Sequence, residues 1–81
     1  MRIYIVFSTL NCDVVGVDTD IESAIKDGAE TEGNFYIEWW NPSKRYYEER
    51  TDYIYDDKTV YELSDPVWQD GRILPQNIKW R

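Results

Sequence analysis

A chain of 81 residues and 9.7 kDa is long enough for one small domain. This length excludes two independently folded units and a large two-lobed cleft. Sixteen acidic and nine basic residues give a net charge of −7. This charge disfavours general binding to nucleic acids or anionic membranes, because both require Lys and Arg. The chain has no histidine, the usual general base at neutral pH and the commonest metal ligand. We therefore expect no enzyme and no cofactor.

The cellular compartment follows from what the sequence lacks. The longest apolar run is residues 3–7, whereas a membrane helix needs roughly 20 apolar residues. No apolar segment that could act as a secretory signal follows Met1-Arg2. Cys12 is the only cysteine, so an internal disulfide is excluded. We expect a cytoplasmic protein that does not bind membranes.

The first two elements are predicted strands. Residues 2–8 place Ile3, Ile5 and Phe7 on one face and Tyr4 and Val6 on the other, which is typical of a strand inside a sheet. Residues 13–18 are rich in valine and predict a second, antiparallel strand. The glycine at position 16 indicates a bulge or a close approach by another side chain.

A helix follows the second strand. Thr19 is the predicted N-cap, with Glu22 at the spacing of a capping box. One stripe at helical spacing is formed by small and apolar residues, namely Ile21, Ala24, Ile25, Gly28 and Ala29. Four carboxylates fall on the opposite side, at Asp20, Glu22, Asp27 and Glu30. Residues 31–34 end this helix.

The remainder predicts further strands and an irregular tail. Residues 34–40 alternate as a strand. Residues 41–50 fit either a hairpin turning at Pro42 or a short helix capped by Asn41, and the hairpin is favoured by the paired Trp and Tyr residues. Residues 51–55 and 59–63 predict two short strands, and residues 64–81, with Trp68 and Trp80, an irregular segment packed on the body or on a partner. The predicted fold is one α+β domain over residues 1–81: an antiparallel sheet of about four to five strands with one amphipathic helix packed on it.

Catalytic constellations are weak. A Cys–His or Ser–His pair cannot form without histidine, and the acidic neighbour Asp13 disfavours a reactive Cys12 thiolate. Asp18 with Asp20, and Asp56 with Asp57, are the candidate carboxylate pairs of a hydrolase. The simpler interpretation is that the first pair stabilises the start of the helix and the second forms a turn.

Two surface features are the candidate binding sites. Residues 13–38 contain eight acids and one base, Lys26, and are interpreted either as a solvated helix face or as an acidic surface that steers the protein to a basic partner. Seven Tyr and four Trp exceed what a small core can hide, so one member of each aromatic pair is expected to anchor a partner or a second copy. The predicted partner-binding residues are Asp20, Glu22, Asp27, Glu30, Trp39, Trp40, Tyr46 and Tyr47.

The first thirty residues carry a resemblance. The sequence Arg2-Ile-Tyr-Ile-Val-Phe-Ser8, then Val14-Val-Gly-Val17, then the helix from Asp20 to Ile25 resembles a loose group of small phage-encoded β-β-α proteins. These motifs are of low specificity and cover residues 2–30, and members of the group have no shared activity to transfer. The resemblance implies a phage or mobile-element origin, where small acidic proteins often block host defence or nucleic-acid enzymes.

Two functions are expected from these observations. The first is an acidic, non-enzymatic protein that inhibits or modulates a host protein with a basic surface by occupying it, in the cytoplasm of the host cell and without direct nucleic-acid binding. The alternative is a homodimer that binds or sequesters a nucleotide, with Trp and Tyr stacking on the base and Arg45, Arg50 or Arg72 holding the phosphate. A carboxylate hydrolase is the third and weakest hypothesis.

Overall fold

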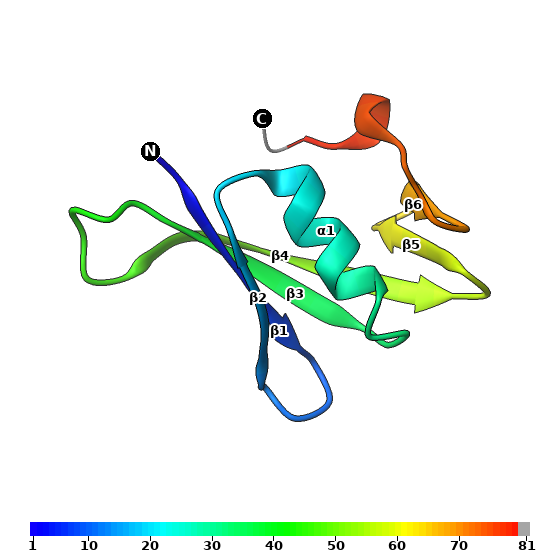
Figure 1. Cartoon of the computed structure of the whole chain (residues 1–81), viewed down its shortest axis with the longest axis horizontal. Coiled ribbons are helices and arrows are strands. Elements are labelled where there is room, and N and C mark those ends of the chain that lie inside the picture. Colours follow the sequence, from blue (N-terminus) through cyan, green and yellow to red (C-terminus); the bar gives the residue numbers. More distant parts are fainter. Residues whose placement is uncertain (80–81) are drawn as a thin grey trace.

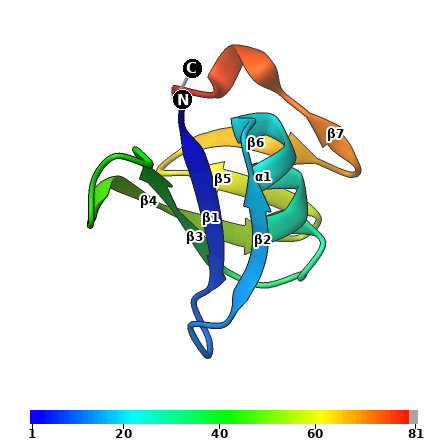
Figure 2. The same cartoon turned by 60° about the vertical axis from the view of Figure 1, so that its left-hand side comes forward.

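The computed structural model describes residues 1–79 and shows one curled antiparallel sheet with a helix against it (Figures 1 and 2). The strand order is β2-β1-β3-β4-β5-β6-β7, and each strand is antiparallel to its neighbours. The elements are β1 (Ile3–Ser8), β2 (Val14–Asp18), α1 (Ile21–Ala29), β3 (Phe35–Trp40), β4 (Tyr47–Asp56), β5 (Thr59–Glu62), β6 (Asp65–Gln69), β7 (Arg72–Ile73) and a short 3₁₀ helix, η1 (Pro75–Asn77).

The α+β class is confirmed, but the prediction of about four to five strands was too low: residues 1–79 form seven. The segment from residue 64, expected to be irregular, contributes β6 and β7 to the sheet. Val67 of β6 is fully buried, and Asn77 donates a hydrogen bond from its side chain to the Pro66 carbonyl at 2.7 Å. The segment therefore packs on the body of its own chain. Trp80 lies outside the described residues.

The hairpin prediction for residues 41–50 was right, with different bounds. β3 and β4 pair directly, and the loop between them spans residues 41–46. In that loop the Asn41 side chain accepts hydrogen bonds from the backbone and hydroxyl of Ser43, which closes a turn and leaves no short helix. β4 then runs for ten residues without a break. It joins the second arm of the predicted hairpin to the predicted strand of residues 51–55.

The N-cap of the helix lies one residue later than predicted. Asp20, and not Thr19, is the N-cap, because its carboxylate accepts hydrogen bonds of 2.9 Å from both the backbone and the hydroxyl of Ser23. The predicted stripe is confirmed: all five of its residues are buried. They pack on the inner, concave face of the sheet.

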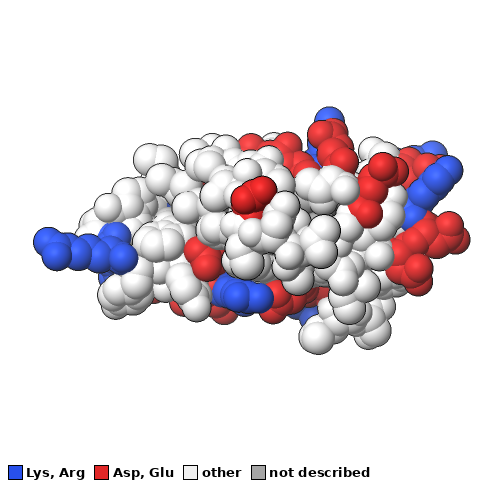
Figure 3. Space-filling model, turned by 90° about the horizontal axis from the view of Figure 1, so that it is seen from below, with Lys and Arg blue, Asp and Glu red and all other residues white. Residues whose placement is uncertain are grey.

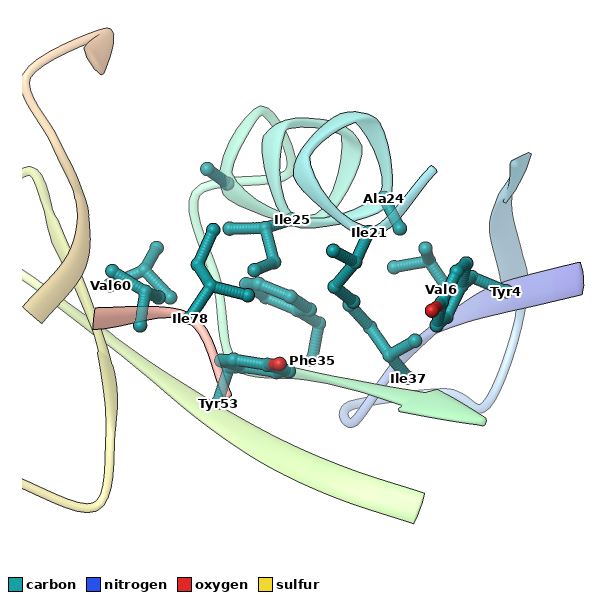
Figure 4. Packing of buried hydrophobic residues seen from close by; sticks show 12 residues of the cluster. Tyr4, Val6, Ile21, Ala24, Ile25, Phe35, Ile37, Tyr53, Val60 and Ile78 are labelled. Carbon is teal, nitrogen blue, oxygen red and sulfur yellow. The ribbon is translucent and has the colours of Figure 1, made fainter. Parts of the chain in front are cut away.

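Phe35 lies at the centre of the core, between the helix and the sheet (Figure 4). Its ring stacks on that of Tyr53 with 5.0 Å between centroids, and Gly28 of α1 lies directly over it. On the same side of the sheet, Val6 and Ile37 are fully buried opposite each other on β1 and β3. Since all of these side chains point toward α1, the inner face of the sheet is filled.

Candidate protein-binding surface

The outer face of the sheet carries a second apolar surface, which α1 does not cover (Figure 1). Residues paired directly across strands share a face. The outer face is thus identified by Ile3 paired with Trp40, Phe7 paired with Tyr36, and Ile5 paired with Val17. We call this surface the open face. Its apolar and aromatic members are Ile3, Ile5, Phe7, Val14, Val17, Tyr36, Trp40, Tyr47 and Ile54.

Several members of the open face are strongly exposed. The relative exposure is 62% for Val17, 56% for Val14, 52% for Ile54 and 44% for Tyr47. Seen from below, the molecule shows large uncharged areas interrupted by a few charged side chains, with Asp and Glu most frequent toward one end (Figure 3). An exposed apolar surface of this kind marks a binding site more often than a scattered set of apolar residues does.

A ladder of three stacked side chains runs across the middle of the open face. Phe7 and Tyr36 stack with 4.8 Å between centroids, and the Arg50 guanidinium lies 3.8 Å from the centre of the Tyr36 ring. Asp52 holds the other side of Arg50 at 2.8 Å. Burial between these groups raises the pKa of the Tyr36 hydroxyl, and its hydrogen bond with the Cys12 thiol adds to the rise. These contacts hold Phe7, Tyr36, Arg50 and Asp52 against one another within the chain itself.

The four predicted aromatic residues divide between three places. Trp40 and Tyr47 lie together on the open face, with their rings 6.2 Å apart. Trp39 lies on the inner side, where it packs against the core beneath the Arg2 guanidinium and donates from Nε1 to Glu49. Tyr46 is exposed in the loop between β3 and β4. The prediction that Trp39 and Trp40 point to opposite faces is confirmed.

The four predicted acidic residues do not form one solvated row. Asp20 is occupied as the helix cap, and Glu30 is exposed at the other end of α1. Glu22 is half-buried beside Tyr4 and Thr19, where they line a shallow hollow. Asp27 points down toward β2, over Gly16. An added Cβ at position 16 would lie 2.5 Å from an Asp27 carboxylate oxygen, so any larger residue there would require the Asp27 side chain to move.

Asp18 faces Asp27 from β2, and this crowding changes its acidity. Burial, a hydrogen bond with Asp27 and repulsion by the Asp27 and Asp20 charges together raise the pKa of Asp18 to about 6. Among residues 1–79 the ion pairs use Glu48, Asp52 and Asp65 on the other half of the chain. Within residues 1–79, the carboxylates of β2 and α1 therefore have no Lys or Arg partner at ion-pair distance.

The residues of the nucleotide-binding alternative are not gathered together. Arg50 is engaged by Tyr36 and Asp52, Arg45 lies in the loop between β3 and β4, and Arg72 lies on β7 at the far end of the strand order. Within residues 1–79, no three Cys, Asp or Glu side chains are arranged to hold a metal ion. In the same range no helix has the length and apolarity needed to cross a membrane.

Sequence reasoning missed the residues that make the open face continuous, above all Phe7, Tyr36 and Ile54. The signal was present in the first strand, where both faces are apolar although a single helix is predicted. One helix covers one face of a sheet, so the other apolar face of a central strand had to remain open or find a partner.

No protein-family model matches the chain, and no curated protein or solved structure is significantly similar to it.

Proposed function

We propose that the chain is a non-enzymatic binding protein of phage or mobile-element origin, which occupies a surface of a larger host protein in the cytoplasm and blocks its activity. The open face is the observation that carries the proposal, because it joins exposed aliphatic residues to preordered aromatic ones. Interfaces are enriched in aromatic residues and Arg at their centres, and Trp40, Tyr47 and Arg50 fit this composition.

The charge distribution supports a partner with a basic surface. Seven of the eight acids of residues 13–38 lie on β2, on α1 or in the segments that flank them, at the β2 border and on the inner side of the sheet, and Glu38 lies on β3 within the open face. An acidic border of this kind speeds the encounter with a basic partner, and the apolar centre then holds the complex. The resemblance of residues 2–30 to small phage-encoded proteins adds that the partner is a host defence or nucleic-acid enzyme.

Capture from a lysate of the host cell tests the proposal. The double variant Val17→Lys/Ile54→Lys places two charges on exposed positions of the open face, where side chains have room and the fold is spared. We expect the tagged wild-type protein to retain one protein in stoichiometric amount, and the variant to lose it. Activity of the captured enzyme, measured with and without added protein, then tests inhibition.

The matched control is Leu10→Lys/Leu63→Lys. Both leucines are more exposed than the test positions, at 94% and 80%, and both lie in turns outside the open face. The control should capture as well as the wild type. Equal loss in both variants would assign the effect to net charge. A protein that captures nothing but carries a nucleotide through purification would replace this proposal with the nucleotide-binding alternative.

A further inference from the structure

One edge of the sheet is free to accept another strand. β2 forms one end of the strand order and pairs only with β1 among the described strands. Edge strands are usually protected by Lys, Pro, short length, bulges, inward-pointing charges or covering segments, and of these β2 has a register shift between Val14 and Gly16 and the inward-facing Asp18. The other edge, β7, has two residues and is followed by Pro75. β2 has five residues, and neither Lys nor Pro occurs between positions 13 and 20.

The hydrogen-bond pattern shows which backbone groups point outward at this edge. Ser8 donates to the Asp13 carbonyl, and the next residue, Thr9, donates to the Asn34 carbonyl before β3. Even-numbered residues of β1 therefore bond toward β2, and odd-numbered residues bond toward β3. Val17 lies opposite the odd-numbered Ile5, so its N–H and C=O groups point away from β1, toward the open edge.

The irregular register of β2 gives the edge two different sides. Val17 pairs with Ile5 and Val14 with Phe7, so both valines lie on the open face although they are three residues apart. A shift in register between these pairs makes this spacing possible. On the other side of the strand, Gly16 and Asp18 face α1, where Asp27 lies over the glycine. Figure 2 shows β2 at this border of the sheet beside α1.

We infer that the β2 edge binds an extended segment of the partner protein in which Lys or Arg alternates with apolar residues. Backbone pairing would be supplied by the outward groups of β2. Side chains of one parity would lie against Val14, Val17 and Phe7, and those of the other parity would reach Asp18 and Asp27. The inference rests on the proposed function, for which it supplies the chemistry of the partner.

A second copy of the chain fits this edge less well. Each copy carries a charge of −7. Antiparallel pairing of two β2 strands about Gly16 would pair Asp13 of each copy with Thr19 of the other, which lies between Asp18 and Asp20. Like charges gathered on neighbouring strands are destabilising. A basic strand instead neutralises carboxylates that form no ion pair within the described part of the chain.

The test uses isotope-labelled protein and a short synthetic peptide in which Lys and Val alternate, with a Glu-Val peptide of the same length as its counterpart. We expect the Lys-Val peptide to shift amide resonances of residues 13–19 in NMR spectra, and to bind less tightly as salt rises from about 50 to 300 mM. The Glu-Val peptide should not bind. Shifts located elsewhere, or equal binding of both peptides, would overturn the inference.

Two variants separate charge from backbone pairing. Asp18→Asn/Asp27→Asn should weaken Lys-Val peptide binding by about tenfold. Asp56→Asn/Asp57→Asn, which makes the same change in net charge in the turn between β4 and β5, should change binding by less than about twofold. Val17→Pro removes an outward N–H and should abolish the shifts. Thermal unfolding verifies that each variant is folded. An equal loss in both Asn pairs would overturn the inference.

Capture of the host protein, compared with peptide binding, distinguishes a failure of this inference from a failure of the proposed function. If Val17→Pro loses the peptide and still captures its partner through the open face, the edge inference fails and the proposed function stands. If the peptide binds as expected but the wild-type protein captures nothing, the proposed function fails. A dimer in sedimentation analysis, with the amides of residues 13–19 at its interface, would make a second copy the occupant and overturn the inference.

Discussion

At the scale of single residues, the molecule depends on a few close approaches. The helix lies near enough to the sheet for Gly28 to touch the Phe35 ring and for Asp27 to touch Gly16. The two contacts differ in what they tolerate. A ring packed between Gly28 and Tyr53 has nowhere to move, whereas a carboxylate at the end of a side chain does.

Gly28→Ala should therefore destabilise the protein, although alanine is the better helix former. The added Cβ would lie 2.3 Å from two carbons of the Phe35 ring. Overpacking costs about 1–3 kcal/mol, which exceeds the gain in helix propensity of up to about 1 kcal/mol. The measurement is urea unfolding. Gly33→Ala, where nothing lies closer than 4.0 Å, is the control and should change stability by less than about 0.5 kcal/mol.

The raised pKa of Asp18 predicts how the stability of the protein depends on pH. Its pKa is raised to about 6 in the folded protein from 3.8 in the unfolded chain, so the folded state holds the proton more tightly. Stability should then fall as pH rises from about 4 to 6. Asp18→Asn imitates the protonated form, and it should raise Tm at about pH 7 and give no gain below about pH 4.

The control for this pH dependence is Asp13→Asn, which removes the same charge from an exposed position on the same strand connection. Thermal unfolding of the three proteins across this pH range makes the comparison. An equal gain from Asp13→Asn would assign the effect to net charge and contradict a specific role for the Asp18–Asp27 contact.

At the scale of elements, two hairpin turns differ in how well their residues suit a backbone with positive φ. The turn between β6 and β7 uses Asp70 and Gly71 at φ values of 47° and 87°. The turn between β4 and β5 uses Asp57 and Lys58 at 47° and 61°. A hairpin turn in which both central residues have positive φ favours Asn-Gly or Asp-Gly at these two positions. Lys58 therefore adopts a backbone conformation that is unfavourable for a residue with a side chain.

Lys58→Gly should accordingly stabilise the protein by about 1 kcal/mol. The reverse exchange, Gly71→Lys, should destabilise it by a similar amount, since it puts a side chain at φ 87° in the better turn. Chemical unfolding of both variants measures the two changes. Loss of stability in Lys58→Gly would contradict this account of the turn.

At the scale of the whole molecule, total surface and charge both favour a monomer. The accessible area is 5145 Å². The accessible area expected for an ordinary monomer of 9.7 kDa is about 5100 Å². The total area is therefore that of a monomer, and it gives no sign of surface that a second copy would have to bury. Together with the charge of −7, this predicts a monomer in sedimentation at tens of micromolar, at low and at high salt. A stable dimer would contradict it.

Much of the fold was predictable because it depends on local patterns. The buried stripe of α1 follows helical spacing, and all five residues are buried as expected. The alternation in β1 and β3 likewise predicted which residues share a face, including the opposite directions of Trp39 and Trp40. The N-cap was misplaced by one residue, because Thr19 and Asp20 are both good caps and only the contact with Ser23 distinguishes them.

The strands of the tail and the open face were decided by tertiary structure. Residues 65–73 carry no clear alternation, and they become strands because β5 offers an edge and Val67 a place in the core. The sequence shows which residues of the helix are acidic, but packing decides where their side chains lie. Asp27 lies against β2, and Asp20 caps the helix. A sequence pattern states which residues share a face, whereas the number of layers in the fold decides which face is left uncovered.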